Sequence, residues 1–329
     1  MKTYKIAIVG ATGLVGRTAL KVFEEKNISN LEFSLFSSKK SAGTKLKFLN
    51  TDFIVRELTD SSFDEKFDFA LFSAGAKTSK HFAPIAASKG CIVIDNSSAF
   101  RMDDKVPLIV PEVNFEDVKN HHNIIANPNC STIQAVVALK PLDDKFKIKR
   151  IVYSTYQAVS GAGKIGLQDL EQHTTLKFQH PIYDNCLPQI DTFLVNHYTK
   201  EEMKMVNETR KILKHPNLSI TATAVRVPVT NCHGESINVV FEKSFELTDI
   251  FNTLKSAPGI IVQDDIENDI YPIASNVNGH DEVFVGRIRK DFSIKNGLNL
   301  WVVADNLRKG AASNAIQIIE KMINVDKDI

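Results

Sequence analysis

The chain of 329 residues has few cysteines, little net charge and no long apolar run. Four cysteines without a CxxC pair are too few for a disulfide scaffold, and their scarcity predicts a reducing compartment, the cytoplasm. The 40 Lys and Arg against 39 Asp and Glu leave a net charge of +1, which argues against a nucleic-acid or membrane-surface partner. No stretch approaches the roughly 18 apolar residues of a membrane span.

An apolar segment near the first residue has two interpretations. Lys2 and Lys5 precede the run 6–9, a pattern shared with signal peptides. The run ends at Gly10, however, and the polar Thr12 comes two residues later. A strand, a turn and a helix therefore fit this segment better than a signal sequence.

The length suits two domains, and the first part of the chain indicates a parallel α/β domain. Short apolar runs alternate there with helical patterns, and strands buried on both faces are expected to read as continuous apolar runs. The expected strands are 4–9, 31–36, 67–72 and 91–94, and the expected helices are 14–26 and 79–89.

The pattern changes after residues 127–130. The expected strands are then 148–158, 218–229, 235–241, 283–288 and 298–304, with polar helices between them. This predicts an α+β domain built on a mixed or antiparallel sheet. The last helix, 306–323, is expected to pack on the first domain. That domain would then comprise 1–128 and 306–329, around a second domain at 129–305.

Three glycines at 10, 13 and 16 lie between the first strand and the first helix. Such glycines allow a tight turn, the approach of backbone amides to a pyrophosphate, and close packing of helix on strand. The helix N-terminus adds partial positive charge for the phosphates. The spacing is GxxGxxG and not the common GxGxxG, so a glycine turn of purely structural purpose is the alternative.

The end of the second strand bears on the choice of cofactor. NAD-specific sites place Asp or Glu there, to bind the ribose 2′-hydroxyl. Residues 37–43 read SSKKSAG, with two lysines and no acid. Cations and hydroxyls suit a 2′-phosphate, which favours NADP. The alternative is an exposed lysine pair on a loop.

Cys130 is the candidate nucleophile. It follows the turn-forming Asn-Pro-Asn at 127–129 and precedes the apolar helix 133–139. A helix N-terminus stabilises a thiolate, and its N–H groups are expected to stabilise a developing oxyanion. A lone cysteine is often an inert core residue, as we expect of Cys91 in the apolar run 91–94. That remains the alternative for Cys130.

A cysteine nucleophile needs a proton partner, and His233 is the candidate. It is expected in a turn before a strand, a few residues after Arg226 in the preceding strand. The spacing fits a plain turn residue equally well. Four other histidines lie in polar segments and are expected at the surface: His121, His122, His197 and His215. No HExxH or cluster of His and Cys is present, so no metal site is expected.

Taken together, these segments resemble the bacterial form of aspartate-semialdehyde dehydrogenase over nearly the whole chain. The resemblance rests on GATGLVG at 10–16, FSAG at 72–75, IDNSSAFRMDDKVPLIVPEVN at 94–114, ANPNCSTIQ at 126–134, TYQAVSGAGKIGLQDLEQ at 155–172, RVPVTNCHGES at 226–236 and DNLRKGAA at 305–312. It implies a Rossmann-type NADP-binding domain, an α+β catalytic and dimerisation domain with a mixed sheet, and a homodimer. The implied reaction is the NADPH-dependent reduction of L-aspartyl 4-phosphate to L-aspartate 4-semialdehyde with release of phosphate. This reaction serves lysine, threonine and methionine biosynthesis.

The resemblance also implies roles for single residues. Cys130 matches the nucleophile and His233 the acid–base residue. The implied substrate contacts are Gln157, Arg226, Glu208 and Asn129, and the implied phosphate contacts are Arg101 and Lys211. The implied cofactor contacts are Gly10, Thr12, Gly13, Leu14, Val15, Lys40, Ser41, Ser73, Ser160, Gly161 and Asn306.

Two departures from the family pattern stand out. The family usually has Arg where this chain has Lys40, and a lysine offers a point charge and no bidentate fork, so the preference for NADP is expected to be weaker. Asn231 and Cys232 replace the aromatic or small residues that commonly precede the histidine, which leaves the local packing open.

Three alternative functions remain at this point. They are N-acetyl-glutamyl-phosphate reductase, glyceraldehyde-3-phosphate dehydrogenase, and a non-enzymatic NADP-binding redox sensor that uses Cys130. Arg226 with the Glu208 and Lys211 pair favours a small amino-acid substrate over a sugar phosphate.

Overall fold

The computed structural model of the protein describes residues 2–327. It contains two compact units, of which the first comprises Met1–Pro128 and Ala311–Ile329 and the second Asn129–Gly310. The domain boundaries predicted from the sequence differ from these units in residues 306–310, which group with the second unit.

The first unit is built on a six-stranded sheet in which every neighbouring pair is parallel. In sheet order the strands are β5 (Arg56–Glu57), β2 (Leu31–Ser37), β1 (Tyr4–Val9), β6 (Phe69–Phe72), β7 (Ile92–Asp95) and β8 (Ile124–Ala126). Taken in chain order within this sheet, the arrangement is 3-2-1-4-5-6, which is the doubly wound order of dinucleotide-binding domains. The order reverses between β1 and β6, where such sheets bind their ligands.

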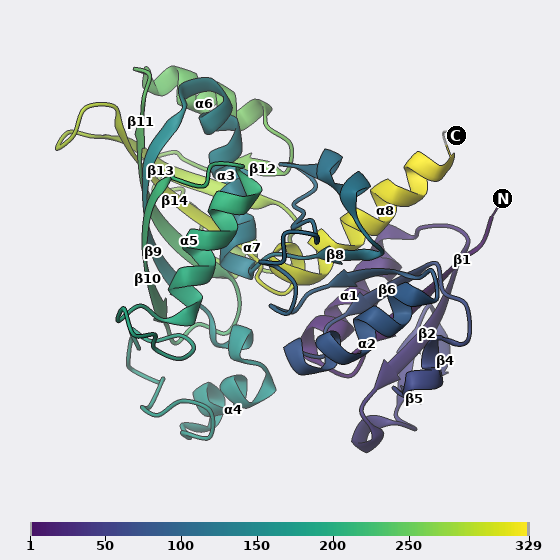
Figure 1. The fold of residues 1–329 in the computed structure, drawn as a ribbon. Coiled ribbons are helices and arrows are strands. Elements are labelled where there is room, and N and C mark those ends of the chain that lie inside the picture. Colours follow the sequence, from purple (N-terminus) through teal and green to yellow (C-terminus); the bar gives the residue numbers. More distant parts are fainter. Residues whose placement is uncertain (1, 328–329) are drawn as a thin grey trace. The chain divides into compact units, whose positions relative to one another are not determined.

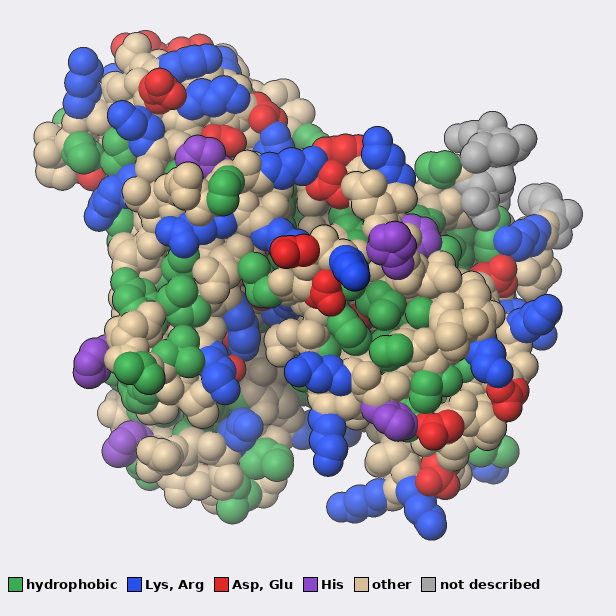
Figure 2. Space-filling view, viewed as in Figure 1, with side chains coloured by type: hydrophobic (Ala, Val, Ile, Leu, Met, Phe, Trp, Pro, Cys, Tyr) green, Lys and Arg blue, Asp and Glu red, His purple; other side chains and the backbone are tan. Residues whose placement is uncertain are grey.

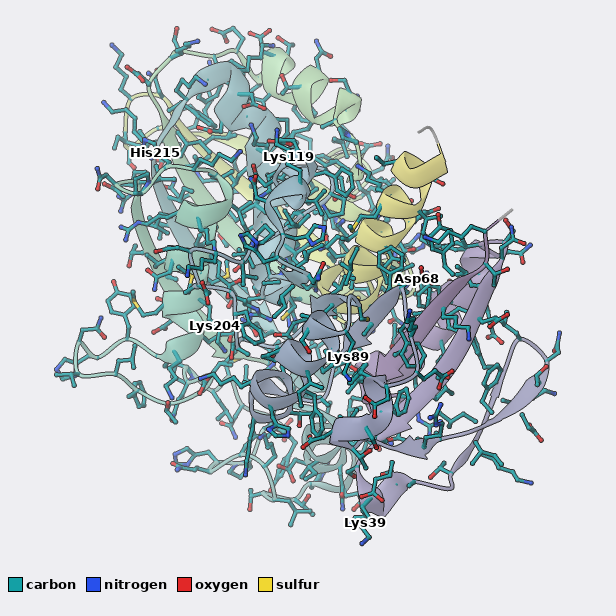
Figure 3. The ribbon with its side chains drawn as sticks, turned by 45° about the vertical axis from the view of Figure 1, so that its right-hand side comes forward. Lys39, Asp68, Lys89, Lys119, Lys204 and His215 are labelled. Carbon is teal, nitrogen blue, oxygen red and sulfur yellow. The ribbon has the colours of Figure 1, made fainter. Side chains whose placement is uncertain are left out.

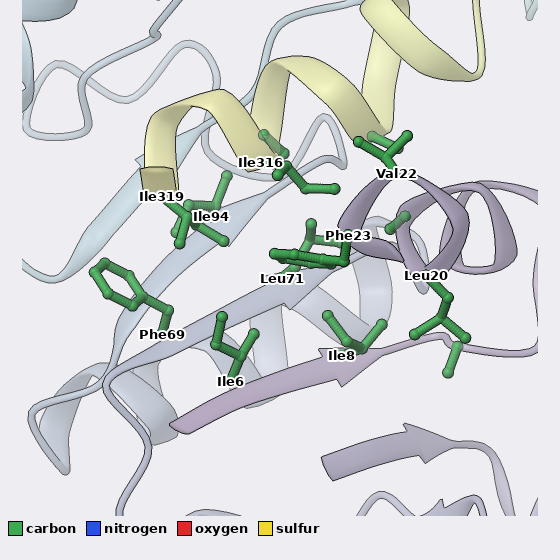
Figure 4. Packing of buried hydrophobic residues seen from close by; sticks show 14 of the residues in the cluster. Ile6, Ile8, Leu20, Val22, Phe23, Phe69, Leu71, Ile94, Ile316 and Ile319 are labelled. Carbon is green, nitrogen blue, oxygen red and sulfur yellow. The ribbon is translucent and has the colours of Figure 1, made fainter. Parts of the chain in front are cut away.

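Helices α1 (Leu14–Lys26), α2 (Ala76–Ser88) and α8 (Ser313–Lys327) belong to this unit, with a small hairpin of β3 (Lys45–Phe48) and β4 (Thr51–Ile54). Figure 4 shows the core between the sheet and two of the helices, where Ile6 and Leu71 of the strands meet Phe23 of α1 and Ile316 of α8. These side chains are buried because each helix turns one apolar stripe toward the sheet. The prediction that the last helix returns to the first domain is confirmed.

The start of that last helix was predicted wrongly. A π-helical turn, Arg308–Ala312, precedes α8, which begins at Ser313 and not at residue 306. The Gly310 N–H donates to the carbonyl of Asp305, five residues back, and this bond gives the wider π geometry.

The second unit has a mixed six-stranded sheet. In sheet order the strands are β10 (Ser219–Arg226), β9 (Ile148–Gln157), β11 (His233–Phe241), β14 (Gly297–Ala304), β13 (Val283–Asp291) and β12 (Ile260–Val262). The β10–β9 and β13–β12 pairs are parallel and the others antiparallel. Helices α3 (Cys130–Phe146), α5 (Lys200–Ile212) and α6 (Leu247–Ser256) pack on this sheet (Figure 1). The remaining helices of the unit are the shorter α4 (Lys164–Gln172) and α7 (Ala274–Val277).

Three strand boundaries in this unit differ from the prediction by two or more residues. β13 ends at Asp291 and not at residue 288. β10 ends at Arg226 and not at residue 229, because Pro228 has no N–H to donate to a sheet. β11 begins at His233 and not at residue 235, because the preceding turn is completed by Cys232, whose φ is +71°. His233 is therefore a strand residue and not a turn residue.

The surface agrees with the low net charge. Figure 2 shows Lys and Arg side chains interspersed with Asp and Glu over the visible face. Among the described residues, no helix is long and apolar enough to cross a membrane.

Candidate active site

A cavity of about 570 Å³ lies in the first unit, at the carboxyl ends of β1, β2 and β6. Its lining includes Gly10, Thr12, Gly13, Ser41 and Ser73, all of which the sequence assigned to the cofactor. The volume falls within the usual range of small-molecule sites. The cavity occupies the point where the strand order reverses, as in other doubly wound sheets.

The glycines of this turn are required by close backbone approaches. Gly10 has a φ of +88°, and a Cβ there would lie 2.8 Å from the carbonyl oxygen of Ser73. A Cβ on Gly16 would lie 2.3 Å from the carbonyl oxygen of Gly10, so only glycine lets α1 pack this closely on the turn. Gly13 is the N-cap of α1 and supplies no side-chain cap. The helix start therefore borders the cavity with backbone alone, as phosphate binding requires.

The cation at this cavity is Lys39. Lys39 lines the cavity beside Ser38 and Ser41, whereas Lys40 is exposed and is not among the lining residues. Figure 3 labels Lys39 at the loop after β2. Leu14 and Val15 form the first residues of α1, directly after the glycine turn.

Arg101, the predicted phosphate ligand of the first unit, is buried and held by backbone carbonyls. Its Nε donates to the carbonyl of Asn127 at 2.9 Å and its Nη2 to that of Asn96 at 3.1 Å. Asp95, at the end of β7, accepts hydrogen bonds from Ser79 and Ser97. Burial raises the pKa of Asp95 although these bonds and the charge of Arg101 oppose the shift.

In the second unit the strand register brings three predicted residues to one edge of the sheet. Gln157 ends β9 and pairs with Arg226, which ends the parallel strand β10. The next strand, β11, runs antiparallel and starts at the same edge with His233. All three side chains are almost completely buried.

The backbone of Ala158 fixes two of these side chains. Its N–H donates to Nδ1 of His233 at 3.0 Å, and its carbonyl accepts from Nη1 of Arg226 at 2.6 Å. Because Nδ1 is an acceptor, the neutral imidazole carries its proton on Nε2. Burial and the charge of Arg226 lower the pKa of His233 to about 3. His233 is therefore neutral at pH 7.

Two buried side-chain nitrogens at this edge are available to a ligand. Within the described chain, Nε2 of His233 and Nε of Arg226 have no hydrogen-bond partner. A Cβ on Gly161 would lie 3.0 Å from Nη1 of Arg226 and 3.5 Å from Nε2 of His233. A glycine at 161 therefore avoids crowding these two side chains. Buried donors without a partner cost free energy, which a bound ligand would recover.

Cys130 is the first residue of α3. Asn129 caps the helix, because its Oδ1 accepts from the N–H groups of Ser131 and Thr132 at 3.0 and 3.4 Å. This corrects one expectation, since these two N–H groups serve the cap and not an oxyanion. Burial lowers the pKa of Arg226, while the charges of Glu201 and Cys130 raise it, which places these two groups within electrostatic reach of Arg226.

Gly310 packs directly on the candidate nucleophile. A Cβ at Gly310 would lie 2.8 Å from Cβ of Cys130.

Burial raises the pKa of the Cys91 thiol to about 12, so Cys91 is the inert core residue that its apolar surroundings predicted.

Helix α5 presents the predicted Glu208 and Lys211 pair on one side. Glu208 is buried, and its Oε2 accepts from the backbone N–H of Asn129 at 2.7 Å. Lys211 is half-buried one turn further along the helix. Glu208 therefore contacts the residue that precedes Cys130.

Ser160 and Asn306 form a hydrogen-bonded pair in the second unit. Nδ2 of Asn306 donates to Oγ of Ser160 at 2.9 Å, and Oδ1 of Asn306 accepts from the N–H of Cys232 at 2.9 Å. Asn231 is tied to Asp305 at 3.0 Å, while Cys232 packs in an apolar cluster with Val277, Phe284 and Val303. These contacts show how Asn231 and Cys232 are packed, which the sequence left open.

Three buried residues near this edge were missed by the sequence reasoning. Glu201 of α5 accepts from the side chains of Asn129 and Gln157, and Gln134 of α3 donates to the carbonyl of His233. Glu235 follows His233 by two residues in β11, and burial raises its pKa well above the ordinary value. Glu201 occurs in a Lys- and Glu-rich helix, where composition predicts exposure. Among the described residues no group of His, Cys, Asp or Glu is arranged to hold a metal ion.

The chain matches two family models along most of its length. Residues 5–121 match the model described as the NAD-binding domain of semialdehyde dehydrogenase, and residues 139–309 match the dimerisation domain of semialdehyde dehydrogenase. A curated relative from Aquifex aeolicus, named aspartate-semialdehyde dehydrogenase, is 53% identical over 97% of this chain and 98% of its own length. The chain belongs to the aspartate-semialdehyde dehydrogenase family. A relative of the same name from Bacillus subtilis is 47% identical over 96% of both chains.

Solved structures give the same family. Aspartate semialdehyde dehydrogenase II from Vibrio cholerae, complexed with ASA, has a TM-score of 0.94 at 43% identity and covers 98% of this chain and 99% of its own. The Candida albicans enzyme with NADP has a TM-score of 0.78 at 26% identity, over 97% of this chain and 98% of its own. This chain is accordingly an oxidoreductase of aspartate-family amino-acid biosynthesis, with a Rossmann-type domain and a domain built on a mixed sheet.

Proposed function

We propose that this chain reduces L-aspartyl 4-phosphate to L-aspartate 4-semialdehyde, with NADPH as reductant, through a thioester on Cys130. The observation that carries this mechanism is the position of Cys130 at the first residue of α3, within electrostatic reach of the buried Arg226. A cation and a helix N-terminus both favour the thiolate form of a cysteine.

The first step is acyl transfer. The Cys130 thiolate attacks the acyl carbon of the substrate, the bond from that carbon to the phosphate oxygen breaks, and phosphate leaves with its electron pair. Oxyanion stabilisation is assigned to Nε2–H of His233, because the N–H groups of Ser131 and Thr132 already bind Asn129. A single such donor is typically worth about 3 kcal/mol of transition-state stabilisation.

The second step needs a hydride and a donor that stabilises the developing oxyanion. The cavity in the first unit fits a dinucleotide, because a Cβ on Gly10 would close its glycine turn and because α1 meets it with uncapped backbone. Gly10, Thr12, Gly13 and Ser73 would hold the cofactor, with Lys39 toward the 2′-phosphate. Bound NADPH supplies the hydride that reduces the thioester carbon.

We assign His233 to the oxygen at which charge develops in this step. Its Nε2–H donates a hydrogen bond to the oxygen of the thiohemiacetal on Cys130 and so stabilises the negative charge that the hydride leaves there. When the carbon–sulfur bond breaks, the electron pair of that oxygen forms the aldehyde carbonyl, the thiolate of Cys130 reforms, and the proton stays on Nε2. The hydrogen bond from Ala158 holds the ring in the tautomer that this requires.

Substrate recognition follows from the remaining polar groups. Arg226 offers an unpartnered Nε to the substrate carboxylate. Glu208 is assigned to the substrate amino group, and Gln157 is assigned to the substrate as a hydrogen-bond acceptor. Lys211 of α5 is assigned to the phosphate, and Arg101 in the first unit is assigned the same role. Ser160, Gly161 and Asn306 are assigned to the cofactor, as the family pattern implies.

We further propose a homodimer in the cytoplasm. The match of residues 139–309 to a dimerisation domain supports the dimer. None of the four cysteines, all within the described residues, forms a disulfide, and a reducing compartment keeps the thiol of Cys130 reduced.

The reverse assay tests this function. Semialdehyde, phosphate and NADP are given to the wild-type chain and to Cys130→Ala, and NADPH formation is followed. We expect turnover that needs all three compounds and that falls by about 10³-fold or more in the variant, as for other lost nucleophiles. A folded wild-type chain without semialdehyde-dependent NADPH formation would refute the assignment.

A further inference from the structure

Glu201 is a buried carboxylate that collects donors from three elements. Its Oε1 accepts from Nδ2 of Asn129 at 2.8 Å and from Nε2 of Gln157 at 3.3 Å. Its Oε2 accepts from Nζ of Lys204 at 2.9 Å. These donors come from the start of α3, the end of β9 and the next turn of α5. One carboxylate on α5 therefore links Asn129, which precedes Cys130, to Gln157.

The bond to Asn129 fixes the start of α3. Because Nδ2 of Asn129 is bound to Glu201, its Oδ1 turns toward the N–H groups of Ser131 and Thr132. The backbone N–H of Asn129 is bound to Glu208, seven residues along the same face of α5. Two carboxylates, two helical turns apart, thus hold the residue that immediately precedes Cys130.

The bond to Gln157 decides what that side chain offers a ligand. Its amide group has two hydrogens, and Nε2 donates to both Oγ1 of Thr155 at 3.2 Å and Oε1 of Glu201. Both donors are therefore used within the protein. Gln157 can present only its carbonyl oxygen, as an acceptor, to a substrate.

The charge of Glu201 is retained in spite of its burial. Burial raises the pKa of Glu201, but the charge and hydrogen bond of Lys204, the hydrogen bond of Asn129 and the charge of Arg226 lower it to about 2. Lys204 is less deeply buried than Glu201 and also binds Asp191 at 3.1 Å, which anchors its ammonium group. A fixed ion can hold its neighbours more strongly than a neutral acceptor can.

We propose that Glu201 is a positioning residue, which acts through Asn129 and Gln157 to hold Cys130 and the side-chain amide of Gln157 in their reactive arrangement. The inference rests on the proposed role of Cys130. It goes beyond the family resemblance, which gave Glu201 no role. A shift of about 1 Å in such groups can lower a rate by about 10²-fold.

The neighbouring Glu202 provides a matched control. It is buried on the same helix, and its carboxylate accepts from the N–H groups of Thr199, the N-cap of α5, at 2.7 Å and of Ala224 in β10 at 3.0 Å. Glu201→Gln and Glu202→Gln each remove one buried charge and keep the side-chain shape. A merely structural role predicts that the two variants behave alike.

Two readouts on the full-length chain separate the possibilities. The first is the split between kcat and KM in the reverse assay. The second is the rate at which iodoacetamide alkylates Cys130, followed by peptide mapping so that the exposed Cys186 does not contribute. Alkylation needs no substrate, so it reports on positioning even if the proposed reaction is wrong.

For Glu201→Gln we expect kcat to fall about 10- to 100-fold and the alkylation rate of Cys130 to change at least severalfold. Glu202→Gln should keep both within about twofold, although it loses stability by an amount similar to Glu201→Gln. A folded Glu201→Gln variant with wild-type kcat and alkylation rate would overturn the proposal. If that variant does not fold, Lys204→Gln decides, because it loosens the carboxylate from the less buried side. We then expect a smaller change in both readouts, and no change in either would overturn the proposal.

Discussion

The burial of neutral His233 predicts a specific dependence of stability on pH. Its pKa in the folded chain is lowered to about 3 by burial and by Arg226, whereas an unfolded histidine titrates near 6.5. Between these values the unfolded chain binds one proton more than the folded chain. Stability from this residue is therefore complete above about pH 6.5 and is lost as the pH falls toward 3.

The magnitude follows from the same shift. Through proton linkage, this pKa shift lowers the free energy of unfolding by about 3 kcal/mol between pH 7 and pH 4. The loss reaches about 5 kcal/mol below the pKa of His233 in the folded chain. Because the His233 side chain is completely buried, solvent does not screen the interactions that lower its pKa. The Ala158 N–H, which points at Nδ1, also opposes protonation of that nitrogen.

The comparison is between the wild-type chain and His233→Asn. Asparagine cannot titrate, and its side-chain oxygen can still accept from the Ala158 N–H. Denaturant unfolding at pH 7 and pH 4 gives the difference in free energy of unfolding between the two proteins, and the carboxylates common to both cancel. We expect the stability advantage of the wild type to shrink by about 3 kcal/mol at pH 4. An advantage that stays constant within about 0.5 kcal/mol would show that His233 is not held neutral.

Three further predictions follow from single contacts. Asn129→Ala removes the cap of α3 and should lower the free energy of unfolding by about 1–2 kcal/mol in denaturant titrations; an unchanged midpoint would contradict the cap. Gly310→Ala places a Cβ against Cys130 and should cost about 1–3 kcal/mol of stability and change the alkylation rate of that thiol, so unchanged values of both would contradict the contact. Lys39→Glu should lower the ratio of kcat/KM for NADP over NAD by about tenfold, and Lys40→Glu by less; the opposite order would return the 2′-phosphate to Lys40.

The parts of the fold that were predictable have a local physical cause. The strand, glycine turn and helix at residues 4–26 could be predicted because Gly10 and Gly16 occur where a side chain would collide with backbone. The start of β11 could not, because it depends on the left-handed φ of Cys232, a conformation unusual for that residue type. The π-helical turn at 308–312 likewise has no periodicity that marks it in advance.

The site shows the same division. Cys130 could be identified as the candidate nucleophile from the sequence, because a turn-forming segment followed by an apolar helix predicts a helix N-terminus at this residue. The choice between Lys39 and Lys40 was not visible, because adjacent residues in a turn point in different directions that only the backbone sets. The burial of Glu201 could not be predicted, because a glutamate in a helix rich in charged residues is normally exposed to solvent. Its partners, Asn129 and Gln157, are distant in the sequence and reach it only in the folded chain.

The thioester on Cys130 can be tested directly by omitting phosphate. With semialdehyde and NADP alone, the chain can form the thioester and one NADPH but cannot release the acyl group to phosphate. We predict a rapid burst of at most one NADPH per chain, and an aspartyl adduct by mass spectrometry on the peptide that contains Cys130. A burst without an adduct, or an adduct on the exposed Cys186 while Cys130 stays unmodified, would contradict the proposed mechanism.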